Sequence, residues 1–242
     1  MRLGDWILLV CIAVGTVVLL GLGTWQVQRL AWKEAMIERA QTNRTAEPIP
    51  YDGLFPLEET GEDLEYLPVT VTGRFLHDRE VYYFATYEGG ATGRFVYTPL
   101  ERADGSIVWV NRGFVLQEDV DPARRADGQI EGVIEVRGLS RMAPAEKPNS
   151  LFPDNEPQNR LFFWKDRDAM TEAAGLDPTQ VLPFFVDAAR DGPHAAPRLP
   201  VGGVTRIEFP NNHLQYAVTW YGLALTLLVV GGAFLWRRIR TT

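Results

Sequence analysis

The sequence predicts a membrane protein in which two transmembrane α-helices flank one mainly β domain, an antiparallel barrel or sandwich of the α+β type. The helices are predicted by residues 6–25 and 214–236, which contain no charged side chain. A helix rises about 1.5 Å per residue, so either stretch can cross a hydrocarbon core of about 30 Å. The β domain is predicted by short runs of alternating apolar and polar residues, separated by turn sequences, between residues 67 and 187.

The first apolar stretch is more typical of a retained anchor than of a cleaved signal peptide. Its basic end has only Arg2 and the amino terminus against Asp5, and residues 21–25 do not form a small-x-small cleavage site. Two core helices of a soluble protein are the other alternative, but such helices rarely run this long without a charge. Nothing before Trp6 resembles an arginine-rich transit peptide, so we expect a bacterial inner membrane.

Charges beside the two stretches predict the topology. Arg237, Arg238 and Arg240 follow the second stretch, and the positive-inside rule assigns them to the cytoplasm. Three basic residues between positions 29 and 39 argue weakly the other way. Two crossings return the amino terminus to the cytoplasm. We therefore expect a cytoplasmic amino terminus at residues 1–5, transmembrane helices at 6–25 and 214–236, one periplasmic domain at 26–213 and a basic cytoplasmic tail at 237–242.

Composition excludes several classes of partner and site. Of the 24 basic and 31 acidic residues, Arg2, Asp5 and the three terminal arginines lie outside the central domain, which leaves 20 basic and 30 acidic residues there and a net charge of about −10. Such a domain is a poor partner for nucleic acid or for anionic lipid. The one cysteine, Cys11, lies in the first apolar stretch, so the chain has neither an internal disulfide nor a CxxC site.

Helical and loop patterns lie on both sides of the predicted strands. Residues 30–45 continue the first helix, and their charged side chains lie on its solvent-exposed face. Residues 46–61 contain three prolines and an Asp-Gly pair, so we expect a loop. Asp166 or Asp168 can cap a short helix that runs through Ala174.

The strands are predicted from alternation and from the turn residues between them. They are residues 67–75, 80–86, 93–100, 106–115, 129–139, 160–164, 181–187 and 202–208. Gly73 and Gly113 lie inside two of these runs and indicate a bulge or a close approach of another backbone. We expect Asn111 and Arg112 to be turn residues.

No sequence pattern specifies an enzyme. GxSxG, HExxH, Walker A and GxGxxG motifs are absent. The acidic run at residues 58–63 is typical of a solvated loop, and the Gly-rich stretch at 89–93 is typical of a hairpin turn. We therefore expect a protein that is not an enzyme.

The three histidines are the candidate metal ligands. His77 stands where a strand should turn and is expected at the surface, whereas His194 lies in a Gly- and Pro-rich loop. His213 immediately precedes the second apolar stretch, and on a helix it shares a face with Tyr216 and Trp220. Imidazole is a common axial ligand of haem iron, for which aromatic faces make suitable walls. The alternative is an ordinary interfacial histidine in an aromatic belt.

Four segments resemble the motifs of one known family. They are residues 23–33 (GTWQVQRLAWK), 110–115 (VNRGFV), 159–168 (NRLFFWKDRD) and 211–222 (NNHLQYAVTWYG). In this order they are similar to the opening, central, third and closing motifs of the Surfeit locus protein 1 family, although a Trp often stands in that family where this chain has Phe114. The resemblance spans almost the whole chain, and the closing motif is the most specific.

The resemblance implies a cytochrome c oxidase assembly factor that binds haem a as cargo and assists its insertion into oxidase subunit I. Subunit I and the haem a synthase are the implied protein partners. His213 is the implied axial ligand of the haem iron, with Tyr216, Trp220 and Trp25 as pocket walls. Arg29 could pair a haem propionate bidentately. Taken singly, Trp25 and Arg29 are also typical of residues that anchor a helix at the membrane surface.

Two alternatives stay open at the level of the sequence. A cofactor-free membrane scaffold that stabilises an oxidase assembly intermediate needs no haem ligand, and only one strong ligand candidate exists. A periplasmic sensor also has two helices around an outer domain, but the sequence has about five residues before the first helix and about six after the second. A sensor would therefore need a separate output partner, and we rank it last.

Overall fold

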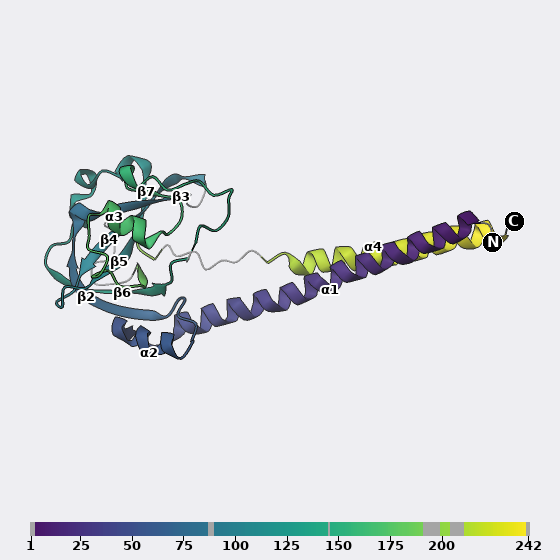
Figure 1. The fold of residues 1–242 in the computed structure, drawn as a ribbon, viewed down its shortest axis with the longest axis horizontal. Coiled ribbons are helices and arrows are strands. Elements are labelled where there is room, and N and C mark those ends of the chain that lie inside the picture. The colour runs from purple at the N-terminus through teal and green to yellow at the C-terminus, as the bar shows by residue number, and fades with distance from the viewer. Residues whose placement is uncertain (1–2, 87–89, 145, 191–198, 204–210, 241–242) are drawn as a thin grey trace. The chain divides into compact units, whose positions relative to one another are not determined.

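The computed structural model describes residues 3–86, 90–144, 146–190, 199–203 and 211–240 (Figure 1). The chain divides into two compact units. A helical unit contains Met1–Arg39 and Ile207–Thr242, and a β unit contains Ala40–Arg206.

The helical unit consists of the first and last helices of the chain. Helix α1 spans Leu3–Thr45 and helix α4 spans His213–Arg240. By length and composition both can cross a membrane, and only 11% of the most apolar window of each is buried. A core helix of a soluble protein would be mostly buried, so the exposed apolar surface favours contact with lipid. The two predicted long apolar helices are confirmed, and α1 runs on without a break through residues 30–45.

Small residues allow the two helices to pack closely. A Cβ added at Gly23 would lie 2.8 Å from the ring of Tyr221, and one added at Gly231 would lie 2.8 Å from Ile12. Glycine at such contacts lets helix backbones approach each other, as it does in membrane helix pairs generally. The glycines of both helices therefore fix how α1 and α4 meet.

The β unit contains one mixed sheet whose central strands close into a barrel. Its strands are β1 (Ile49–Pro50), β2 (Pro68–Phe75), β3 (Val81–Thr86), β4 (Thr92–Glu101), β5 (Ile107–Leu116), β6 (Val133–Arg141), β7 (Leu161–Phe162) and β8 (Phe185–Ala188). The order is β1-β2-β6-β8-β5-β4-β3-β7, and β2 also pairs with β4 through Arg74–Glu101 and Phe75–Leu100. This last pairing closes a five-stranded barrel of β2, β6, β8, β5 and β4.

The mainly β fold is confirmed, with two differences of detail. The sheet is mixed rather than purely antiparallel, because β8 pairs parallel to β5 after a long crossover connection. The segment expected as a loop at 46–61 contains β1, a 3-10 turn at Tyr51–Gly53 and helix α2 (Leu54–Glu59). The strand predicted at 202–208 falls mostly outside the described residues.

Strand β5 lies between the two hydrophobic cores of the β unit, and each of its faces packs into one of them. Val108 and Val110 belong to the larger cluster inside the barrel, whereas Ile107 and Trp109 belong to a second cluster that also includes Met170 of helix α3 (Arg167–Ala173). Side chains alternate between the faces of a strand. Burial on both faces explains why β5 reads as a nearly continuous apolar run in the sequence.

The two strand glycines have the roles predicted from the sequence. A Cβ at Gly73 would lie 2.5 Å from the carbonyl oxygen of Glu101, so Gly73 allows β4 to approach β2. Gly113 has φ +125°, and a Cβ there would lie 2.0 Å from the carbonyl oxygen of Val201. The register of β4 against β5 shifts at this point and leaves Arg112 as the extra residue of a β-bulge. Asn111 and Arg112 are therefore both in β5, and their prediction as turn residues was wrong.

Candidate functional site

His213 is the first residue of α4, and its side chain is half-buried. The backbone N–H of His213 donates to Asn211 Oδ1 at 3.4 Å, so the asparagine before the helix helps to begin it. Ala217, one turn later on the same face, is 3% exposed. The imidazole therefore lies on the face of α4 that packs in the helical unit.

The side chain of Gln26 in α1 contacts the imidazole directly. Gln26 Oε1 lies 2.7 Å from His213 Nδ1. Since an amide oxygen can only accept a hydrogen bond, Nδ1 must carry the proton in this contact. In the neutral ring the lone pair is then on Nε2, which has no hydrogen-bond partner among the described residues. A neutral imidazole nitrogen of this kind is the form that binds a metal.

A second polar contact lies near the first. Thr24 Oγ1 is 3.2 Å from the hydroxyl of Tyr221, beside the close approach at Gly23. Residues 23–26 of the opening motif thus meet α4 at two points, His213 and Tyr221. The opening and closing motifs, far apart in sequence, form one contact region in the helical unit (Figure 1).

The other predicted site residues lie around this region with different exposures. Trp25 is 53% exposed and Tyr216 is 54% exposed, whereas Trp220 is half-buried. The guanidinium of Arg29 lies 4.1 Å from the centroid of the Trp32 ring, a cation–π contact at the surface of α1. The aromatic rings thus offer open apolar faces, and Arg29 is stacked rather than engaged with a carboxylate.

The donor set fits a haem better than a simple metal ion. In the described part of the chain, no group of three or more His, Cys, Asp or Glu side chains could hold an ion. A haem iron already has four ring nitrogens, so one imidazole with an open Nε2 is sufficient as an axial ligand. His194, the other loop histidine, lies outside the described residues.

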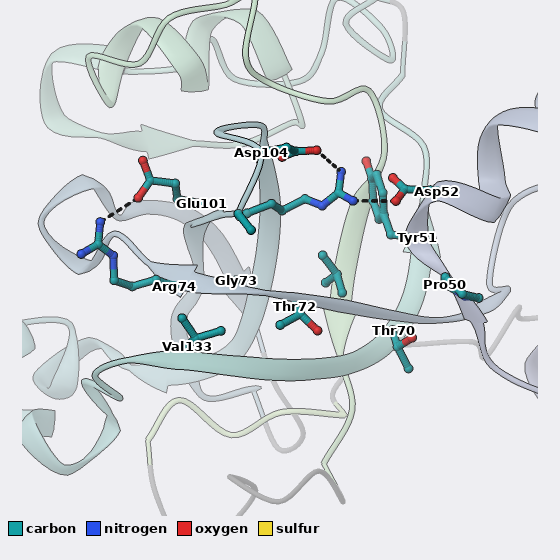
Figure 2. Close-up of a pocket in the computed structure, with 13 residues that line it drawn as sticks. Pro50, Tyr51, Asp52, Thr70, Thr72, Gly73, Arg74, Glu101, Asp104 and Val133 are labelled. Carbon is teal, nitrogen blue, oxygen red and sulfur yellow. Dashed lines mark hydrogen bonds and ion pairs between the residues drawn. The ribbon is translucent and has the colours of Figure 1, made fainter.

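The β unit has a groove of about 600 Å³, lined mainly by residues 50–52, by residues 70–74 of β2 and by residues 101–104 (Figure 2). The charged side chains that line it are paired with one another. Arg102 contacts Asp52 at 2.6 Å and Asp104 at 3.4 Å, and Arg74 contacts Glu101 at 2.7 Å. Each charged side chain of the groove thus has a partner of opposite sign, and Arg102 is shared by two carboxylates.

A smaller cavity of about 350 Å³ is lined by residues of the third motif. Asp166 accepts a hydrogen bond from Ala169 N at 3.0 Å and caps α3, as predicted for one of the two candidate aspartates. Arg167 pairs with its neighbour Asp168 at 3.0 Å. These polar residues of the motif have local structural partners, so the motif stabilises the start of α3.

A buried ion cluster connects β5 with two 3-10 segments of the β unit. The carboxylate of Glu80, 2% exposed, contacts Arg112 at 3.1 Å and Arg125 at 2.5 Å. Burial alone would raise the pKa of Glu80, but contact with His77 and the hydrogen bonds and charges of the two arginines outweigh it and lower the pKa to about 2. The bulge at Arg112 turns its side chain into this cluster.

His77 is part of the same cluster, so its prediction as a surface residue was wrong. The ring is half-buried, with Nε2 2.9 Å from the carbonyl oxygen of Ile130 and Nδ1 3.2 Å from Arg112 Nη1. The 3-10 turn His77–Arg79 places the ring beside Phe75, with 5.5 Å between the ring centroids. Both ring nitrogens thus have partners in the protein, which leaves His77 unsuited to bind iron.

Sequence reasoning missed Gln26 and Glu80. Gln26 did carry a signal, since a buried amide within an apolar helix is costly without a partner. Glu80 carried none, because its partners are 32 and 45 positions away along the chain.

Comparison with known proteins covers both units. The family model described as SURF1 family matches residues 13–225. The chain is similar to Surfeit locus protein 1 of Rattus norvegicus, with 36% identity over 90% of this chain and 71% of the relative, and to that of Homo sapiens, with 37% identity over 91% and 73%. It is also similar to a SURF1-like protein of Drosophila melanogaster, with 32% identity over 90% and 72%.

Proposed function

The chain belongs to the SURF1 family of cytochrome oxidase assembly factors, and on that premise we propose that it binds haem a and assists its insertion into subunit I of cytochrome c oxidase. The observation that carries the proposal is the contact of His213 Nδ1 with Gln26 Oε1 at 2.7 Å, which leaves Nε2 for the iron. The oxidase subunit and the haem a synthase are the proposed partners.

Each residue of the proposed site has a distinct part in holding the cargo. His213 supplies the lone pair of Nε2 to the iron. The exposed rings of Trp25 and Tyr216, with the half-buried Trp220, offer apolar faces to the macrocycle. Arg29 is placed to exchange its stacking contact for a propionate, because a guanidinium pairs well with a carboxylate. The farnesyl tail of haem a can stay in lipid, since the helices present apolar side chains there.

The proposal is tested by purifying the full chain from cells that make haem a and recording its optical spectrum. We expect haem a to copurify with the natural chain, and His213→Ala to lose it. The matched control is Gln215→Ala, an exposed neighbour on α4 that should keep the haem. Equal haem content in the natural chain and His213→Ala would remove His213 as the ligand.

A cofactor-free scaffold is the second candidate function. It is favoured because His213 is the one suitable haem ligand within the described part of the chain. If the natural chain copurifies with oxidase subunit I but contains no haem when haem a is abundant, the scaffold is the better account.

The proposed topology has both termini in the cytoplasm and the β unit in the periplasm of a bacterial cell. It rests on the three arginines at the end of α4. The test uses Ser150→Cys, on an exposed loop of the β unit, in a Cys11→Ser background. A membrane-impermeant maleimide should label this cysteine in intact spheroplasts but should label Arg240→Cys only after lysis. The opposite pattern would refute the topology.

A further inference from the structure

Gln26 is an unusual residue for its position in α1. It is 9% exposed, whereas the neighbouring polar residues Gln28 and Arg29 are exposed. The buried Thr16 satisfies its hydroxyl within α1, by donating to the carbonyl oxygen of Ile12 at 2.7 Å. Gln26 instead makes its hydrogen bond across to α4. A buried amide that crosses between helices needs a specific partner, and His213 is that partner.

We propose that Gln26 is a positioning residue for the iron ligand, which holds the His213 imidazole in the tautomer with the proton on Nδ1 and presents Nε2 to the haem. This inference rests on the proposed function of His213. Histidines that ligate metals commonly donate their other ring N–H to a carbonyl or carboxylate, which fixes the ring and raises its basicity. The 2.7 Å contact between Gln26 Oε1 and His213 Nδ1 supplies such an acceptor.

Neighbouring contacts hold Gln26 at the right distance. Gly23, one turn earlier in α1, has no side chain to separate the helices, and the Tyr221 ring fills that space. Thr24 Oγ1 lies 3.2 Å from the Tyr221 hydroxyl and fixes the same region a second time. Because these contacts do not involve the imidazole, a change at Gln26 can alter the ligand without removing the helix pairing.

The first test compares variants of Gln26 in the full chain loaded with haem a. Gln26→Leu removes the acceptor and should weaken haem binding by about 10- to 100-fold, the usual effect of losing such a partner. Gln26→Glu keeps an acceptor and should keep binding. The iron midpoint potential should fall from Leu to Gln to Glu at position 26, because a stronger acceptor makes the imidazole more basic and stabilises ferric iron. Gln28→Leu, the same change at an exposed position two residues on, is the matched control.

A second test separates the hydrogen bond from any change in packing. In His213→Gly, free imidazole or 1-methylimidazole can act as the iron ligand, but only imidazole has an N–H to donate to Gln26. We expect imidazole to bind more tightly than 1-methylimidazole when Gln26 is present. That preference should shrink in the His213→Gly, Gln26→Leu double variant.

The outcomes distinguish this inference from the proposed function. If the natural chain binds no haem, or His213→Ala binds it normally, the proposed function fails. If His213→Ala loses haem while all Gln26 variants keep the natural affinity and potential, the proposed function stands and the positioning role is wrong. An equal preference for the two imidazoles in both backgrounds also overturns it.

Discussion

The buried cluster around Glu80 gives the most quantitative prediction. Glu80→Gln removes the one carboxylate that contacts both Arg112 and Arg125, whose side chains are 6% and 0% exposed. Removing one partner of a buried ion pair typically costs about 3–5 kcal/mol, because the remaining charge stays buried without compensation. We therefore expect the free energy of unfolding of the β unit to fall by about that amount at pH 7.

The pKa of Glu80 gives an independent magnitude. It is lowered from 4.5 to about 2, and at 1.36 kcal/mol per pKa unit this difference corresponds to about 3 kcal/mol. Because the pKa is lower in the folded than in the unfolded state, this stability is fully present above about pH 4.5 and is lost as the pH falls toward 2. The natural chain should therefore lose stability over this range relative to Glu80→Gln.

Urea unfolding of the full chain in detergent, followed by near-ultraviolet circular dichroism, measures both effects. The matched control is Glu101→Gln, which breaks a surface pair with Arg74 and should cost less than about 1 kcal/mol. The reasoning is refuted if Glu80→Gln at pH 7 lies within 1 kcal/mol of the natural chain, or if their difference does not shrink between pH 5 and pH 3.

Three further predictions concern close packing and a buried hydrogen bond. Gly113→Ala should lower the free energy of unfolding by at least about 2 kcal/mol, because the added Cβ would overlap a backbone carbonyl. The control is Gly132→Ala, which also has a positive φ (+86°) but has open space around it, and it should cost only about 1 kcal/mol. The same urea titration measures both. Gly23→Leu should separate α1 from α4 and reduce the haem a that copurifies with the chain. Gly21→Leu, at a position without neighbours within 4 Å, should leave the haem content unchanged. Equal haem content in the two variants would contradict this prediction. Tyr51→Phe should cost about 1–2 kcal/mol of unfolding free energy, because its hydroxyl donates to a buried backbone carbonyl at 2.8 Å, and a neutral result would contradict this.

Local sequence patterns predicted the strands and helices well, because each such element depends mainly on residues that are close together in the sequence. Alternation located the barrel strands, and the uncharged runs located both long helices. Helix α2 was missed because its segment contains three prolines, yet Pro56 lies in the first turn, where a missing N–H does no harm. The parallel pairing of β8 with β5 was missed because periodicity says nothing about which distant strand becomes a neighbour.

In the candidate site, too, single residues could be predicted from the sequence, but their contacts with distant residues could not. His213 could be chosen from its place at the start of an apolar run, but its orientation toward α1 depends on how two distant helices pack. Gln26 was visible as a polar residue in the opening motif, although its partner was not. The Glu80 cluster could not be predicted, because a bulge and two 3-10 segments bring its members together.

The separation of Gln26 and His213 by 187 positions sets an order of events during synthesis. The ribosome completes α1 and every strand of the barrel before His213 is translated, so the contact between Gln26 and His213 cannot form earlier. On the proposed function, a premature stop codon after β8 would yield a product with a complete barrel and no capacity to carry haem. On the same proposal, haem loading would require that His213 has been translated and has reached α1.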